Sequence, residues 1–376
     1  MNNFTYCLIL LVSISFFSGC KKESDLNDQF SGYIGIEQNY VPYKTEKYLR
    51  ICYMLKTWEY EKEGLNLQRI VIFNKDTKTD LITFQAADFP VIYKDPLPQS
   101  TLVTVSKLDK YYFSIQVPIP FGQTPPANIS HKIILRDTIQ NKEVTFEGGT
   151  FQPRTGESPR LISSPHKGKY WIYHNQSSLD YHYWYAAFIE GSIYTSEKFA
   201  FDTQQTDEKM VDASLGDPKK NESYFNYKDT LYAVASGKVI HLADGRPENS
   251  GDARDMPLKT ADEYAGNYLI LDIGGSCYAV YAHCVPNKFV VKVGDTVSEG
   301  QPLGLCGNSG NSMCPHLHFQ LIDKPDFYYS QGLPFVFKEY TKIGEVVLFP
   351  TVGIKAMAPV VYTNANMENF SIANFK

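Results

Sequence analysis

The residue types best suited to chemistry meet near residue 316, where His316 and His318 are separated by a single leucine. Side chains alternate between the two faces of a β-strand, so a His-x-His segment presents two imidazoles on one face. One ring can then bind a metal while the other reaches a substrate. The preceding residues 307–312 are rich in Gly, Asn and Ser, which accept left-handed backbone conformations and allow close backbone approach to a ligand. A pair of surface histidines in an ordinary strand is the alternative interpretation.

Further motifs stand in a fixed order around this pair. Residues 294–304 lead into the Gly-Asn-Ser-Gly segment 307–310 and then into Pro-His-Leu-His-Phe at 315–319, while Ala-Val-Ala-Ser-Gly-Lys-Val at 233–239 and Tyr-Ala-His at 281–283 lie upstream. Taken together, these motifs resemble the lysostaphin/LytM family of zinc metallopeptidases, whose usual substrates are peptidoglycan peptides. The resemblance is good over residues 195–320 and extends more loosely from 165 to 340.

The resemblance implies a small antiparallel β-sandwich with one zinc ion (Zn²⁺) in a groove between long loops. In the family, zinc is held by the His and Asp of a His-x-x-x-Asp motif and by the second His of His-x-His. Carried over by position, Asp202 and His318 are the implied metal ligands. His283 and His316 are the implied catalytic pair beside the metal.

The sequence departs from the family pattern at Lys198, which stands four residues before Asp202 where the family has a histidine. A lysine ammonium has no lone pair for a metal, and a catalytic zinc normally uses three protein ligands. His182 lies in a segment that looks like a branch of the family lacking this histidine, so it is the tentative third ligand. A histidine packed in an aromatic cluster is the alternative. Glu197 could also coordinate, although a neighbouring strand position would often face away.

The other histidines of this half have no motif around them. We interpret His241, at the end of a predicted strand, as structural, and His166 and His174 as surface-loop residues. The sequence therefore assigns them no role in the site.

Two functions follow from this set of residues. The first is a zinc metalloendopeptidase that hydrolyses peptide bonds in peptidoglycan stem or cross-bridge peptides, with His316 accepting a proton from water and His283 steadying the oxyanion. The alternative is a degenerate, metal-free domain that binds cell wall or regulates an amidase. Lys198 favours the degenerate domain. Retention of Asp202, His283, His316 and His318 favours the enzyme, which is the function that we predict.

The elements that must position these residues are predicted to be strands, so the fold class is mainly β. We expect an N-terminal immunoglobulin-like β-sandwich at residues 38–152, a LytM-type antiparallel β-sandwich peptidase domain at 160–345 and a C-terminal extension at 346–376. The polar, Pro- and Gly-containing residues between 152 and 159 mark the boundary. The clearest predicted strands are 48–53, 67–73, 101–106, 112–117, 131–136, 144–151, 232–234, 238–241, 268–272, 278–283, 289–293 and 316–321.

The N-terminus resembles a bacterial lipoprotein signal. An apolar run at 8–17 is followed by Ser-Gly-Cys, which predicts a signal peptide at 1–19, acylation of Cys20 and a tether at 20–37. Phe17 and the lack of Lys or Arg in the first six residues depart from that pattern, and an ordinary secretory signal is the alternative. The prediction places the protein in the bacterial cell envelope, periplasmic or surface-exposed, held to a membrane by the lipid.

Cysteine usage and charge complete the sequence analysis. If the exported chain forms a disulfide, Cys306 and Cys314 are the expected pair because they flank one loop. The net charge of −5, from 36 basic and 41 acidic residues, gives no electrostatic reason to expect nucleic acid as a partner. The expected partners are peptidoglycan peptides and a membrane.

Overall fold

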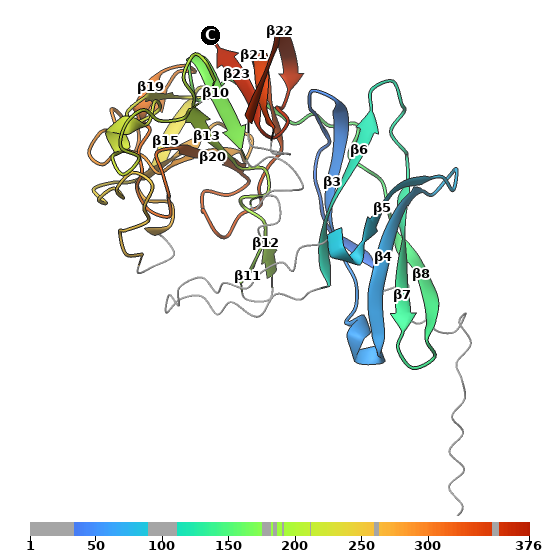
Figure 1. Cartoon of the computed structure of the whole chain (residues 1–376). Coiled ribbons are helices and arrows are strands. Elements are labelled where there is room, and N and C mark those ends of the chain that lie inside the picture. The colour runs from blue at the N-terminus through green and yellow to red at the C-terminus, as the bar shows by residue number, and fades with distance from the viewer. Residues whose placement is uncertain are drawn as a thin grey trace, which may run out of the picture.

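A computed structural model describes residues 34–88, 111–174, 182, 186–189, 192–210, 212–258, 263–347 and 353–376. The predicted signal peptide, Cys20 and the predicted strand at 101–106 lie outside these residues. Within the described residues, the structure contains no helix long and apolar enough to cross a membrane. The protein is mainly β, as the sequence predicts. Its strands form two bodies, which can be told apart in Figure 1.

The N-terminal body consists of two four-stranded antiparallel sheets. One contains β1 (Gly35–Asn39), β3 (Tyr48–Lys56), β2 (Tyr43–Lys44) and β6 (Tyr112–Pro120), and the other has the order β5 (Asp80–Gln85), β4 (Leu65–Asn74), β7 (Ile129–Asp137), β8 (Lys142–Phe151). Apolar residues of β3, β4, β6, β7 and β8 share one core, so the two sheets form a sandwich. Its immunoglobulin-like character and its boundaries remain predictions. Two 3₁₀ helices, η2 (Tyr60–Glu63) and η3 (Ala86–Asp88), accompany it.

The C-terminal body is built on one eleven-stranded sheet. In spatial order the strands are β18 (Thr296–Val297), β15 (Gly237–Ala243), β16 (Tyr268–Asp272), β17 (Tyr278–Ala282), β20 (Leu317–Ile322), β13 (Phe201–Gln205), β10 (Gly168–His174), β23 (Ser371–Phe375), β21 (Phe335–Val347) and β22 (Gly353–Ala365), and β9 (Arg160–Ile162) pairs with β21. Smaller elements are β11 (Ala187–Ile189), β12 (Ser192–Tyr194), β14 (Thr230–Tyr232), β19 (Pro302–Leu305) and the 3₁₀ helix η4 (Asn221–Ser223).

Three adjacent strands bring the predicted site together. In the register of the sheet, Asp202 of β13 lies opposite His318 of β20, and His318 also lies opposite Ala282 of β17. His283 follows Ala282 directly and has a positive φ of 63°, unusual for a residue with a side chain. Residues that are more than a hundred positions apart in the chain therefore meet at one end of these strands.

The structure differs from the predicted strands and boundaries in three places. Of the predicted strand at 232–234, only Tyr232 lies in a strand, at the end of β14. Residues 289–293 do not form a strand, although Val290 N–H donates to Leu303 O at 3.0 Å. The segment set apart as a C-terminal extension contributes β22 and β23 to the main sheet, and β23 lies between β10 and β21. Such pairing between distant strands leaves no local signal in a single sequence, which is why the predicted boundary at 345 falls inside β21.

The two bodies contact each other through a mixed apolar and polar interface. Phe199 packs edge-on against the Tyr40 and Tyr43 rings, with centroids 4.9 and 5.7 Å apart. The Tyr40 hydroxyl is 2.5 Å from Thr195 Oγ1. Lys342 of β21 and Glu46 form a buried ion pair across the same boundary. The N-terminal sandwich thus packs directly on residues 195–199, a segment that leads into β13.

Candidate active site

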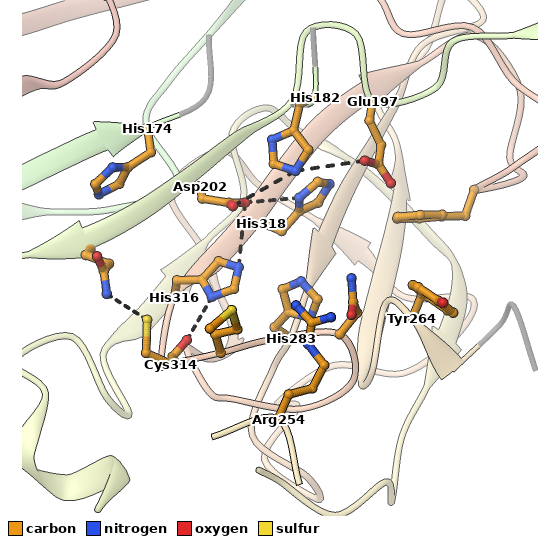
Figure 2. A pocket seen from close by; sticks show the side chains of 14 residues that line it. His174, His182, Glu197, Asp202, Arg254, Tyr264, His283, Cys314, His316 and His318 are labelled. Atoms are coloured by element: carbon orange, nitrogen blue, oxygen red, sulfur yellow. Dashed lines mark hydrogen bonds and ion pairs between the residues drawn. The ribbon is translucent and has the colours of Figure 1, made fainter. Parts of the chain in front are cut away.

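A cavity of about 590 Å³ opens where β13, β17 and β20 end. Most of its lining residues have polar side chains, several of them titratable, and Figure 2 shows how they converge. The lining residues are His174, His182, Glu197, Asp202, Gln204, Arg254, Tyr264, His283, Asn311, Met313, Cys314, His316, His318 and Phe327. All five residues that the sequence assigns to the metal and to catalysis are among them.

The three proposed ligands lie together in this cavity. One donor atom from each of His182, Asp202 and His318 falls within 4.8 Å of the other two. His318 Nδ1 is 3.0 Å from Asp202 Oδ1, and His182 Nε2 is 4.0 Å from Asp202 Oδ2. His318 Nε2 is 2.8 Å from Gln320 Oε1, which holds the outer nitrogen and turns Nδ1 toward Asp202 and His182. Two imidazoles and a carboxylate are a donor set that zinc accepts, so these residues fit the implied ion.

The charges in this group are strongly coupled. Burial alone would raise the pKa of Asp202, but His182, His316 and His318 together hold it well below the ordinary value for an aspartate. Burial opposes protonation of His318, yet the hydrogen bond and charge of Asp202 outweigh it and raise the pKa of His318 to about 9. Burial lowers the pKa of His182 to about 4. Asp202 is therefore ionised and His182 neutral near pH 7, the protonation states in which both can bind a metal.

His283 and His316 form a pair beside the ligand group, with ring centroids 4.6 Å apart. His283 Nδ1 is 2.8 Å from Ser309 O, and His316 Nδ1 is 2.8 Å from Cys314 O. A carbonyl oxygen only accepts, so each Nδ1 carries a proton and donates it. In the neutral rings Nε2 is then the acceptor, and His316 Nε2 lies 3.6 Å from Asp202 Oδ1. Burial, followed by the neighbouring histidines, keeps the pKa of His283 well below 6.5.

Lys198 does not point into the cavity. Its ammonium contacts Ser114 Oγ, lies 3.7 Å from Met54 Sδ and sits 5.6 Å from the centre of the Tyr40 ring, all in the N-terminal sandwich. Burial lowers the pKa of Lys198 to about 7. Its nitrogen therefore faces the interface between the two bodies. At the position where the resemblance implies a metal ligand, this chain has a side chain that contacts the N-terminal sandwich instead.

Glu197, the neighbour of Lys198, faces the opposite way. Its carboxylate lines the cavity, and Oε2 is 3.8 Å from His182 Nε2. Burial raises the pKa of Glu197 to about 7. The sequence analysis expected this position to face away because it assumed a strand, but residues 196–199 form a turn before β13 begins.

The structure also places residues in the cavity that the sequence did not assign. His174 was expected in a surface loop, but it belongs to β10 and lies opposite Asp202 in the sheet register. Burial lowers the pKa of His174 to about 4. Arg254 comes from the charged stretch 246–264, which has no periodic pattern. The pairing of β10 with β13 brings His174 to the cavity, and a single sequence does not reveal which strands pair. Nothing in the local sequence marks Arg254.

The two other histidines of the C-terminal body, His166 and His241, lie outside the cavity. His166 is buried rather than in a surface loop, where it stacks on Trp171 with centroids 3.7 Å apart and its Nε2 is 2.6 Å from Thr203 Oγ1. Its burial by the Trp171 ring could not be read from neighbouring residues in the sequence. His241 is exposed in β15 and stacks on Tyr268 at 4.8 Å.

The predicted disulfide is not formed. Cys306 and Cys314 are both free thiols in the structure. Cys306 is buried beside Asn226, whose Nδ2 lies 3.4 Å from its sulfur, while Cys314 lies at the cavity wall with its sulfur 3.0 Å from Gln204 Nε2. Flanking one loop did not bring the two sulfurs together, because each side chain packs against a different neighbour.

Comparison with known proteins gives one family and several relatives. The model for peptidase family M23 matches residues 224–328. Peptidoglycan DD-endopeptidase ShyA of Vibrio cholerae serotype O1 is 46% identical over 127 residues, which cover 33% of this chain and 27% of ShyA. Glycyl-glycine endopeptidase ALE-1 of Staphylococcus capitis is 31% identical over 97 residues, 26% of this chain and 22% of ALE-1. The chain thus spans only about a quarter of the length of these relatives.

Among solved structures, the catalytic domain of lysostaphin from Staphylococcus simulans is 22% identical, with a TM-score of 0.22 and coverage of 38% of this chain and 78% of that one. That score is too low to support an inference. The match to the M23 model contains His283, His316 and His318 but begins after His182 and Asp202. Five of the fourteen lining residues, including two of the three proposed ligands, therefore lie outside the residues that the family model covers.

Proposed function

Residues 224–328 match peptidase family M23, of the lysostaphin/LytM type, and from this premise we propose that the protein is a zinc metalloendopeptidase acting on peptidoglycan peptides. The name of the relative ShyA, a peptidoglycan DD-endopeptidase, supports peptidoglycan as the substrate. The observation that carries the proposal is the convergence of His182, Asp202 and His318 beside the pair His283 and His316 in one cavity.

We assign the zinc ligands to His182, Asp202 and His318. When bound, zinc would supply Lewis acidity, which polarises a peptide carbonyl and activates a water molecule. His316 accepts the proton of that water at Nε2, because its Nδ1 is already committed to Cys314 O. Gln320 Oε1 accepts from Nε2 of His318, which leaves Nδ1, 3.0 Å from Asp202 Oδ1, as the nitrogen that would bind zinc.

His283 needs a proton before it can stabilise an oxyanion. Its Nδ1 donates to Ser309 O and burial keeps the ring neutral, so Nε2 accepts in the resting site. The adjacent ring of His316, 4.6 Å away between centroids, is the nearest source of that proton. In our proposal His283 therefore acts after His316: the proton taken from water is held by the pair of rings while the peptide bond breaks, and then passes to the leaving amine.

The test measures zinc content and peptide release from purified peptidoglycan for the wild-type chain and for His182→Ala. We expect about one zinc per chain in the wild type, with zinc and peptidase activity lost together in the variant. His241→Ala is the matched control, because the same side chain is removed from an exposed position outside the cavity. Stoichiometric zinc and full activity in His182→Ala would remove His182 from the ligand set.

The same measurement decides between this function and the metal-free alternative. A wild-type chain that holds no zinc when zinc is supplied, and releases no peptide, would be a degenerate domain that binds cell wall or regulates an amidase. The position of Lys198 is what favours that alternative. The cluster of three convergent donors favours the enzyme.

We further propose that Cys20 carries the lipid that holds the protein in the bacterial cell envelope, after removal of residues 1–19. The apolar run at 8–17 followed by Ser-Gly-Cys supports it. Cys20→Ser should move the protein from the membrane to the soluble envelope fraction. Unchanged partitioning into detergent would show that another element anchors it.

A further inference from the structure

Arg254 is the one lining residue of the cavity with a permanent positive charge. Its side chain is exposed, and it forms no ion pair with any residue that the structure describes. Figure 2 shows the side chain rising toward His283, on the side of the site away from Glu197. An unpaired guanidinium beside a catalytic pair is suited to binding an anionic group of a substrate.

The loop that carries Arg254 is held firmly against the site. Asn249 Nδ2 lies 2.9–3.0 Å from the carbonyl oxygens of Asn308, Gly310 and Ser312, and therefore donates to the glycine-rich loop. Asn249 Oδ1 accepts from Met256 N–H at 3.0 Å, which closes the turn around Arg254. The glycine-rich loop is the one whose Ser309 carbonyl orients His283. One hydrogen-bond network thus positions both the catalytic ring and the base of the arginine.

The second arginine of this stretch provides an internal contrast. Arg246 Nη1 is 3.0 Å from Glu263 Oε1, so its charge is neutralised by an ion pair within the protein. Arg254 has two acidic neighbours in sequence, Asp252 and Asp255, yet Asp255 Oδ1 accepts from Ser250 N–H instead. The charge of Arg254 is therefore left available to the cavity.

We propose that Arg254 binds a free carboxylate of the substrate, on the residue next to the bond that is cut, and so selects stem peptides over glycine bridges. This inference rests on the proposed peptidase function. Peptidoglycan stem peptides contain residues with free carboxylates, whereas a bridge made of glycine carries none along its length. A guanidinium pairs with a carboxylate through two parallel N–H···O bonds, which fixes the peptide as well as attracting it. The register of the peptide then decides which carbonyl lies beside His316.

The experiment uses the full chain and three probes: a cross-linked stem-peptide dimer, the same dimer with the carboxylate beside the cross-link converted to a carboxamide, and pentaglycine. Affinity is measured by calorimetry and hydrolysis by product separation. Because charged hydrogen bonds contribute strongly, we expect the wild type to prefer the acid to the amide by about ten- to a hundredfold. Arg254→Gln should bring this ratio close to one, and Arg254→Lys should give an intermediate ratio.

Lys288→Gln is the matched control, because it removes one positive charge from an exposed residue outside the cavity and should keep the wild-type ratio. Zinc content should be the same in all four proteins. An acid-to-amide ratio near one in the wild type, or faster hydrolysis of pentaglycine than of the dimer, would overturn the proposal while the peptidase function stood. A ratio in binding that depends on Arg254 without any hydrolysis would support the subsite and overturn the peptidase function.

Discussion

Each body of the protein buries histidine, but in different ways. His131 in the N-terminal sandwich is fully buried, with Nδ1 3.3 Å from Gly148 O and Nε2 2.8 Å from the Tyr53 hydroxyl. The carbonyl accepts from Nδ1, so the tyrosine must donate to Nε2 and both ring nitrogens are satisfied by the protein. In the cavity, His283 and His316 have Nδ1 committed to a backbone carbonyl, and Nε2 is left for the site.

This difference shows that burial and a shifted pKa do not identify a functional histidine. Burial lowers the pKa of His131 to about 4, as it does for His182 in the cavity. The two imidazole rings differ in the groups that surround them. His131 lies among Tyr53 and Phe151, whereas His182 faces a carboxylate and a second imidazole. A ring nitrogen that lies close to the donor atoms of other possible metal ligands is what distinguishes the site.

Removal of the central carboxylate should have the largest effect. Asp202 contacts His182, His316 and His318, so Asp202→Ala takes away one proposed ligand and the partner of two others. Even the loss of a group behind a ligand weakens metal affinity by about ten- to a hundredfold, and loss of a ligand itself should exceed that. We expect more than about a hundredfold weaker zinc binding in a competition titration, and hydrolysis at background. His131→Gln, which changes a buried polar residue of the other body, should leave the zinc affinity at the wild-type value.

His316→Ala should separate catalysis from metal binding. We place His316 beside the ligands, so its removal should leave most of the zinc in place. Loss of a proton acceptor typically costs about a hundred- to ten-thousandfold in turnover. Turnover and zinc content measured on the same sample give the comparison. A variant that loses both together would mean that His316 is itself a ligand.

Much of this site could be predicted from the sequence, because its strongest motifs are local. His316 and His318 are two residues apart, and Tyr-Ala-His precedes them at a spacing that the family shares. The ligand group needed more, since His182, Asp202 and His318 come from separate segments that only strand pairing brings together. His182 was proposed from a looser likeness. The structure places its Nε2 4.0 Å from Asp202 Oδ2, and its role as a ligand remains a prediction.

The remaining features depended on packing and had no local signal. Glu197 and Lys198 are neighbours in the chain, but a turn sends one side chain into the cavity and the other into the N-terminal sandwich. Arg254 lies in a stretch without periodicity, and its position follows from the three hydrogen bonds of Asn249. The incorporation of the C-terminal strands into the sheet likewise depends on contacts between distant residues.

The stability of the N-terminal body should depend on pH through His131. Burial depresses its pKa from 6.5 to about 4, so the unfolded chain takes up a proton that the folded chain refuses between these values. Its contribution is therefore fully present above pH 6.5 and is lost as the pH falls toward 4, by about 3 kcal/mol at most. His131→Gln cannot titrate, and its free energy of unfolding should fall less over that range. Parallel pH profiles for the two proteins, measured by denaturant unfolding, would contradict this assignment.

Lys198→His should have the smallest effect on zinc, although it restores the residue that the family has at this position. The side chain at 198 contacts Ser114, Met54 and Tyr40 across the interface between the bodies, so a new imidazole would lie there and not beside Asp202. We expect the zinc affinity of Lys198→His to equal that of the wild type, and the double variant Lys198→His/His182→Ala to remain without zinc. Zinc titrations of both variants are the measurement. Recovery of zinc in the double variant would contradict this expectation. It would mean that the segment 195–199 can rearrange so that the side chain at 198 leaves the N-terminal sandwich and reaches the cavity. Zinc binding in one body would then be coupled, through residue 198, to the contact between the two bodies.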